Sequence, residues 1–324
     1  MTRRLSWLAA VALMLAALVY INNTSRLVTL AVSRPILLAH RGLAQTFRRE
    51  DLKNDTCTAT RIHPPEHPYL ENTIASMQAA FRAGADVVEF DVHPTSDGAF
   101  AVFHDWTLGC RTDGRGVTRE HTLAQLKALD IGYGYTADGG ATFPFRGKGA
   151  GLMPSLDEVL ETFPDRRFLI NVKSNDPREG DLLADRLARL PPERRARLMV
   201  YGGDRPIDVL RRRLPGLPAM SPASLKTCAI RYLALGWSGY VPAACRNTLV
   251  LLPADITPFA WGWPHRLVDR LRRAGTELFV AGAYDGEAGS NGIDAEAQLL
   301  ALPVGYTGGI WTNRIDRIAP LTAR

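Results

Sequence analysis

Short apolar segments alternate with helix-like segments from about residue 36 to the end of the chain, and this alternation restricts the fold more than any other feature. Buried strands of a parallel sheet have this appearance, because helices cover them on both faces. Nine candidate strands can be counted, one more than a (β/α)8 TIM barrel needs, so one must lie outside the barrel. We therefore predict a single α/β domain, a TIM barrel, over residues 34–324. The candidates lie near residues 36–39, 86–92, 100–103, 168–173, 198–201, 217–220, 249–252, 278–281 and 309–311.

The N-terminus carries an uncharged apolar run of 17 residues from Leu5 to Ile21, preceded by Arg3 and Arg4. This length is at the lower limit for a membrane span and long for the core of a signal peptide. No small-x-small cleavage site follows, which favours an uncleaved anchor over a cleaved signal. Basic residues in front of the run keep the N-terminus cytoplasmic. Residues 1–33 are thus expected to form a transmembrane anchor helix and connector, with the barrel on the exported, periplasmic or extracytoplasmic side.

The composition is that of a globular protein, with 46% hydrophobic and 22% charged residues. The net charge of +6 suits anionic partners, phosphates included. No zinc-finger spacing and no RNA-binding signature is present, so a nucleic-acid partner is not expected. No feature of the sequence indicates an obligate protein partner.

Acidic and basic side chains interrupt the first two strands at their ends. His40 and Arg41 close the first strand, Glu89 and Asp91 share one face of the second, and His104 follows the third. A single histidine at a strand end is more often a structural residue than a catalyst. Two carboxylates on one apolar strand are harder to explain, because buried carboxylates are costly unless they are paired or bind a metal. The combination indicates a functional site.

The fourth predicted strand adds Asn171 and Lys173, and in a TIM barrel such strand ends converge on one face. Arg41 and Lys173 suit the non-bridging oxygens of a phosphodiester, and the two histidines suit proton transfer at its bridging oxygens. Glu89 and Asp91 offer the oxygen ligands that hard divalent cations prefer. We interpret the set as a metal and acid/base site.

The motifs also resemble a known family, the glycerophosphodiester phosphodiesterases, in their order and spacing, apart from a longer insertion after the first motif. The resemblance covers almost everything after residue 34. It is carried by His40-Arg41-Gly42, Glu71-Asn72-Thr73, Glu89-Phe90-Asp91-Val92, Thr95, Asp97-Gly98, His104-Asp105, Met153-Pro154-Ser155-Leu156-Asp157-Glu158-Val159-Leu160 and Thr312-Asn313-Arg314.

The resemblance implies hydrolysis of a small glycerophosphodiester, or of a lipid-derived relative, to glycerol 3-phosphate and an alcohol. It implies His40 and His104 as the acid/base pair, and Ca2+ or Mg2+ as the metal. Glu71 would line the same site, near the metal or holding a histidine.

Two departures from the family pattern stand out. Asn171 replaces the family's third metal carboxylate, leaving Glu89, Asp91 and Asn171 as the candidate ligands. This predicts a weaker metal site, a changed metal preference, or a metal-free site that relies on cationic side chains. The late strand near residues 278–284 lacks the family's Trp-Thr-x-Asn pattern. Tyr284 and Trp311 are candidates for a substrate wall, and each is as consistent with ordinary packing.

Four cysteines are present, without CxxC spacing, which argues against a zinc site. Export favours disulfides over free buried thiols. Three pairings are formally open. We expect Cys57–Cys110, whose loops should share one end of the barrel, and Cys228–Cys245.

Two alternative functions remain beside the leading one. The first is a phospholipase that acts directly on membrane lipid, which the anchor makes plausible. The second is a degenerate barrel that binds a phosphodiester without turnover, as Asn171 suggests. Because both histidines, both carboxylates, Arg41 and Lys173 are present, we favour an enzyme.

Overall fold

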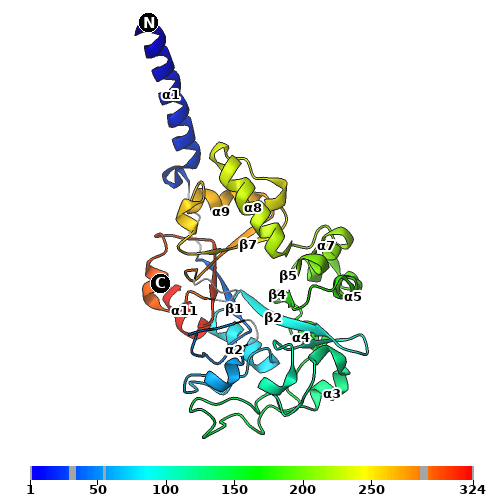
Figure 1. Cartoon of the computed structure of the whole chain (residues 1–324). Coiled ribbons are helices and arrows are strands. Elements are labelled where there is room, and N and C mark those ends of the chain that lie inside the picture. The colour runs from blue at the N-terminus through cyan, green and yellow to red at the C-terminus, as the bar shows by residue number, and fades with distance from the viewer. Residues whose placement is uncertain (1, 29–33, 54–55, 285–290, 323–324) are drawn as a thin grey trace.

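The computed structural model of the chain describes residues 2–28, 34–53, 56–284 and 291–322. A nearly closed barrel of eight parallel strands forms its centre (Figure 1). Part of the expected connector, residues 29–33, lies outside the described residues. The predicted TIM-barrel fold is confirmed.

The barrel strands follow one another in chain order, with β9 returning to β1. All neighbouring pairs in this path are parallel. Between β6 and β7 the ring is bridged by a side chain, because the Thr248 hydroxyl donates to the Ala219 carbonyl at 2.7 Å. The strands are β1 (Ile36–His40), β2 (Val87–Pro94), β4 (Arg167–Val172), β5 (Leu198–Gly202), β6 (Ala219–Met220), β7 (Leu249–Pro253), β8 (Glu277–Ala281) and β9 (Gly309–Thr312).

The ninth strand, β3 (Phe100–Val102), lies outside the barrel and pairs with the end of β2 in the antiparallel direction. The turn at Asp97 and Gly98 reverses the chain, and Gly98 adopts a left-handed φ of 80° that a glycine tolerates without strain. This strand is the surplus candidate of the sequence analysis.

Helices surround the barrel and pack their apolar faces on it (Figure 1). Several begin with a capping box, including the one at Ser155, whose hydroxyl accepts from the Glu158 N–H at 3.1 Å. The helices are α2 (Ile74–Ala83), α3 (Leu123–Lys127), α4 (Leu156–Thr162), α5 (Pro177–Ala188), α6 (Pro192–Arg195), α7 (Asp204–Arg213), α8 (Pro222–Leu235), α9 (His265–Arg273), α10 (Glu296–Leu300) and α11 (Ile315–Thr322).

The barrel interior is filled by one layer of large apolar side chains. Because side chains alternate along a strand, the next inward residue on each strand lies one layer closer to the carboxyl ends. The polar residues of the site therefore lie next to this apolar layer, on the side of the carboxyl ends of the strands. It consists of Leu38, Val87, Leu169, Met199, Met220, Leu249, Phe279 and Trp311.

Helix α1 (Thr2–Asn23) projects away from the barrel beside α8 and α9 (Figure 1). Its span from Ser6 to Asn23 is long and apolar enough to cross a membrane and is not buried against the rest of the chain, as an anchor or a signal sequence would be. Two disulfides join Cys57 to Cys110 and Cys228 to Cys245, the pairing that we expected.

Candidate active site

The polar layer above the apolar floor is built by neighbouring strands in register. His40 of β1 pairs with Glu89 of β2, and Asp91 pairs with Asn171 of β4, which in turn pairs with Tyr201 of β5. His40, Glu89, Asn171 and Tyr201 each follow an inward-facing apolar residue by two positions, and Asp91 follows Glu89 by two, so the strand alternation directs all five side chains inward. The barrel thus assembles residues that are up to 161 positions apart in the chain.

His40 is buried and held at both ring nitrogens. Its Nδ1 lies 2.7 Å from Asn313 Oδ1, and the Nε–H of Arg41 points at its Nε2 at 3.2 Å. With Nδ1–H donated to the amide oxygen, Nε2 carries the lone pair. Burial, followed by the charge of Arg41, lowers the pKa of His40 well below its usual value. The ring lies 5.0 Å from that of Trp311, tilted by 38° to it.

The backbone after β1 turns sharply so that Arg41 points back into the site. Arg41 has a left-handed φ of 57° and Gly42 one of 79°. A Cβ on Gly42 would lie 2.9 Å from the backbone of Ser76, so only glycine fits this approach to α2. The Arg41 guanidinium donates to Glu71 Oε1 at 3.0 Å and lies 3.4 Å from Asp91 Oδ2.

All four oxygens of Glu89 and Asp91 face hydrogen-bond donors. Glu89 accepts from the Tyr201 hydroxyl at 2.7 Å and from the Arg41 N–H at 3.1 Å. Asp91 Oδ1 accepts from Asn171 Nδ2 at 2.8 Å, and Oδ2 accepts from Asn72 Nδ2 at 2.9 Å. The carboxylates are thus satisfied within the protein.

The pKa values of the two carboxyl groups are shifted in opposite directions. Burial, reinforced by the neighbouring Asp91, raises the pKa of Glu89. Burial alone would also raise the pKa of Asp91, but Lys173, His104 and Arg41 together hold it well below its usual value. Asp91 therefore carries the negative charge that balances Arg41 and Lys173, whose Nζ lies 3.5 Å from Oδ1.

His104 faces the same space from the loop after β3. Its Nδ1 lies 2.7 Å from Asp105 Oδ1, so Nε2 is left for chemistry. Burial, then the positive charges of Arg41 and Lys173, lower the pKa of His104. Burial would raise the pKa of Asp105, but Arg111 and the bond to His104 keep it below its usual value. Asp105 is therefore ionised and orients the ring.

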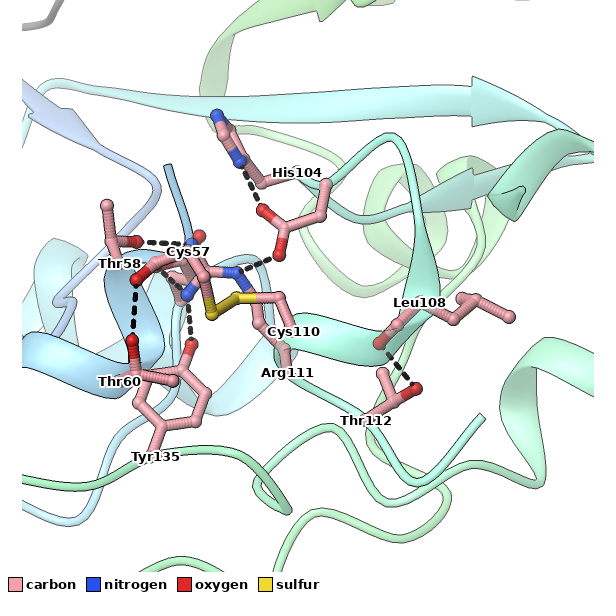
Figure 2. The surroundings of a disulfide bond; sticks show 11 residues. Cys57, Thr58, Thr60, His104, Leu108, Cys110, Arg111, Thr112 and Tyr135 are labelled. Carbon is pink, nitrogen blue, oxygen red and sulfur yellow. Dashed lines mark hydrogen bonds and ion pairs between the residues drawn. A yellow bond between two sulfur atoms is a disulfide. The ribbon is translucent and has the colours of Figure 1, made fainter. Parts of the chain in front are cut away.

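A buried arginine connects the two sides of the site (Figure 2). Arg111 is only 2% exposed, and its Nη1 donates to Glu71 Oε2 at 3.1 Å and to the Tyr135 hydroxyl at 2.7 Å. Its Nε lies 3.0 Å from Asp105 Oδ2, an ion pair by distance without hydrogen-bond alignment. Because Glu71 also holds Arg41, ion pairs and hydrogen bonds run without a break from His104 to Arg41 and on to His40.

The disulfide Cys57–Cys110 lies directly beside this network (Figure 2). Cys57 is followed in the chain by Thr58, and Cys110 is followed by Arg111. Arg111 Nη2 donates to the Thr58 hydroxyl at 2.6 Å, so both of these residues belong to the network. The bond ties the insertion after the first motif to the loop after His104, which fixes the walls on which Arg111 depends.

The other predicted residues are placed as follows. Asp176, the next carboxylate after Asn171 in the chain, caps α5 and pairs with Arg119 at 3.4 Å. Tyr284 is 62% exposed after β8, whereas Trp311 is 2% exposed in the barrel interior, where its ring also meets that of Tyr201. Their role as a substrate wall stays a prediction.

Sequence reasoning did not assign roles to several residues that hold the site together. Asn313 orients His40, Asn72 and Tyr201 hold the carboxylates, and Arg111 connects Glu71 to Asp105. The only local signals were that Asn72 and Asn313 lie within the quoted motifs and that Arg111 follows a cysteine.

Comparisons with known proteins find a family match in the first half of the barrel. Residues 40–185 match the glycerophosphoryl diester phosphodiesterase family. A glycerophosphodiester phosphodiesterase of Caldanaerobacter subterraneus is 39% identical over 104 residues, covering 32% of this chain and 39% of that protein. One from Bacillus subtilis is 37% identical over 114 residues, covering 34% and 38%. The matched regions thus span about two fifths of the length of these relatives.

Solved structures extend the likeness of the fold to most of the chain. The glycerophosphodiester phosphodiesterase of Agrobacterium tumefaciens superposes with a TM-score of 0.56 at 22% identity, covering 88% of this chain and 99% of that one. A glycerophosphoryl diester phosphodiesterase domain from Mycobacterium tuberculosis gives a TM-score of 0.61 at 18% identity, covering 89% and 99%. Through residues 40–185, which contain both histidines and both strand carboxylates, this chain is similar to the glycerophosphoryl diester phosphodiesterase family.

Proposed function

We propose that the protein hydrolyses glycerophosphodiesters to glycerol 3-phosphate and an alcohol. The observation that carries the proposal is the pair His40 and His104, each with Nδ1 held by a side-chain oxygen, in one buried space with Arg41 and Lys173. A structurally similar phosphodiesterase of Oleispira antarctica was solved with the product sn-glycerol-3-phosphate, at a TM-score of 0.55 and 18% identity, over 90% of this chain and 98% of that one. That complex supports the substrate class.

Arg41 and Lys173 bind the phosphodiester in this proposal. The guanidinium matches two non-bridging oxygens, and the ammonium supplies a compact charge. Both cations lie beside Asp91, which fixes them in the site, and Arg41 also pairs with Glu71. As negative charge grows on the phosphoryl oxygens in the transition state, the attraction strengthens, and this lowers the barrier.

The histidines divide the proton transfers by their partners. His104 donates to the ionised Asp105, which stabilises its imidazolium, so it protonates the leaving alkoxide. His40 donates to the neutral amide of Asn313, so its Nε2 takes the proton of the attacking water once the Arg41 Nε–H that points at it has turned to the phosphodiester. Their pKa values are low in the resting site, and a bound anion raises both. In one turnover His40 gains a proton and His104 loses one, so proton exchange with solvent restores both residues.

The divalent metal implied by the resemblance does not fit this arrangement of side chains. Asn171 presents its N–H2 group to Asp91 rather than an oxygen to a cation, and the remaining carboxylate oxygens face other donors. Within the described part of the chain, no group of three or more His, Cys, Asp or Glu side chains is arranged to hold a metal ion. We therefore derive no step through a metal. For a cation to bind Glu89, Asp91 and Asn171, the side-chain amide of Asn171 has to rotate so that its oxygen faces the cation.

We also propose that residues 1–33 anchor the chain in a membrane and that residues 34–324, the barrel, lie on the exported side. The apolar helix α1 supports the anchor, and Arg3-Arg4 in front of it support the orientation. Two disulfides among four cysteines support an oxidising compartment.

The direct test is release of glycerol 3-phosphate from glycerophosphocholine and glycerophosphoglycerol by the full chain in detergent. We expect turnover that falls by about 10²–10⁴-fold in His40→Ala and in His104→Ala, as loss of a general acid or base does. His63→Ala, a histidine of the insertion with an exposed side chain, is the control. No release from either diester, or release that the two substitutions leave intact, would refute the proposal.

A further inference from the structure

The outer face of α8 is apolar, the reverse of what the covering helices of a water-exposed barrel show. Cys228 and Tyr232 form its buried inner side. On the outer side Ile230 is 57% exposed and Leu233 52%, and the stripe continues beyond the helix to Trp237, 46% exposed. Residues three to four apart share a helix face, so these side chains form one continuous strip. With Leu235 and Tyr240, 44% and 51% exposed, they form what we call the α8 surface.

This surface adjoins the end of the apolar helix α1. The side-chain amides of Asn22 and Asn23 both donate to the Trp237 carbonyl, at 3.0 and 2.7 Å. From the other side Arg270 donates to the Asn22 carbonyl at 2.7 Å and to Asn23 Oδ1 at 3.0 Å. Figure 1 shows α1 leaving the barrel beside α8 and α9. The end of α1 is therefore fixed to the barrel at the same point where the apolar strip ends.

The chain segment that contains α8 is basic. Residues 209–254 contain six Arg and Lys residues and no Asp or Glu. Lys226 and Arg231 are exposed on α8, and neither forms an ion pair with any residue that the structure describes. Unpaired cations next to exposed Trp and Tyr side chains match the headgroup region of an anionic bilayer, where aromatic rings and basic side chains concentrate.

We propose that the α8 surface lies on the lipid bilayer, with Trp237 and Tyr240 at the level of the headgroups, as a second membrane contact beside α1. The partner is a membrane with anionic lipid. The disulfide Cys228–Cys245 joins α8 to the following segment, so the surface docks as one rigid unit. The inference rests on α1 being a membrane span, and it holds whichever diester the barrel hydrolyses.

Tryptophan quenching by brominated lipid tests the proposal on the full chain. The protein is reconstituted in phosphatidylcholine vesicles with phosphatidylglycerol, with and without bromine on the acyl chains near the headgroup. Trp7, Trp106 and Trp237 are each replaced by Phe, and the quenched component of each is obtained by difference. Trp106, 45% exposed beside His93, is the matched control for Trp237, and Trp7, 75% exposed on α1, reports the span.

We expect Trp237 to be quenched at least twofold more strongly than Trp106. The double variant Ile230→Ser/Leu233→Ser, at exposed positions that the fold does not need, is expected to halve this quenching and leave that of Trp7 unchanged. Lys226→Gln/Arg231→Gln is expected to weaken it only when phosphatidylglycerol is present.

Three results would overturn the proposal. Quenching of Trp7 alone leaves the span intact and removes the docking contact. Absence of quenching at both Trp7 and Trp237 removes the span and the contact together, without touching the proposed hydrolysis. If Trp237 is not quenched and instead cross-links to another copy of the chain, a second copy and not lipid covers the α8 surface.

Discussion

Replacing Arg111 by methionine tests whether the buried arginine holds the active site together. Methionine keeps much of the volume but removes every hydrogen bond to Glu71, Tyr135 and Thr58 and the charge opposite Asp105. Removing one member of a buried ion pair typically costs about 3–5 kcal/mol, because the partner is left uncompensated. At ~2 °C for each kcal/mol in a domain of this size, the melting temperature should fall by about 6–10 °C.

The matched control is Arg213→Met. Arg213 also contacts two carboxylates, Asp181 and Asp185, but all three side chains are substantially exposed, and such pairs contribute only about 0–1 kcal/mol. Thermal unfolding of both variants in the same detergent, followed by circular dichroism, gives the difference directly. If Arg111→Met costs no more than Arg213→Met, the reasoning is wrong.

A positioning role for Arg111 also predicts a kinetic signature. Because Arg111 reaches the histidines only through Asp105 and Glu71, its loss should misorient His104 while Lys173 still binds the phosphate. We expect kcat for glycerophosphocholine to fall by at least tenfold with KM changed less than threefold. Equal changes in both would indicate a general loss of structure.

Three further predictions concern the metal, the disulfide and acid stability. Asn171→Glu places a third carboxylate beside Asp91, so we expect the melting temperature of this variant to fall in chelator and to rise with Ca2+ by more than that of the unchanged chain. An equal rise in the two proteins would contradict this interpretation of the site. Cys57→Ala/Cys110→Ala should lower both the melting temperature and kcat, because Thr58 and Arg111 lose their shared support, whereas Cys228→Ala/Cys245→Ala should leave kcat unchanged. Equal kcat values in the two variants would contradict this role of the first disulfide. The pKa of Asp105 is lowered in the folded state, so this carboxylate stabilises the fold above its unfolded pKa of about 4, and the stabilisation is lost as the pH falls through the folded pKa. In urea unfolding at a series of pH values, Asp105→Asn should therefore lose less stability in acid than the unchanged chain, and an equal loss would refute this assignment.

The fold could be predicted because its signal is local. Each barrel strand is a short apolar run, and several of the helices between the strands begin with a side-chain cap, such as Ser155 before α4. The inward placement of Glu89 and Asp91 follows from the strand period alone. The position of β3 outside the barrel was not predictable from its composition, because only its pairing direction with β2 distinguishes it.

The partners that orient the site residues could not be predicted, because they come from distant segments. His40 is oriented by Asn313, 273 residues later, and Arg111 bonds to Glu71 at a separation of 40. Asn171 was expected to offer its oxygen to a cation. Its hydrogen bond to Asp91 depends on the charges of Arg41 and Lys173 around that carboxylate, which no local pattern encodes.

The central claim is hydrolysis by a histidine pair in which His104 protonates the leaving group and His40 activates water. The most direct measurement compares two glycerol 3-phosphate diesters, one with choline and one with p-nitrophenol, in the unchanged chain, His40→Ala and His104→Ala. A good leaving group needs no proton, so His104→Ala should lose about 10²–10⁴-fold on the choline ester and less than tenfold on the nitrophenyl ester. His40→Ala should lose activity on both. Equal losses of His104→Ala on the two esters would contradict the assignment, and absence of turnover on both by the unchanged chain would contradict the function itself.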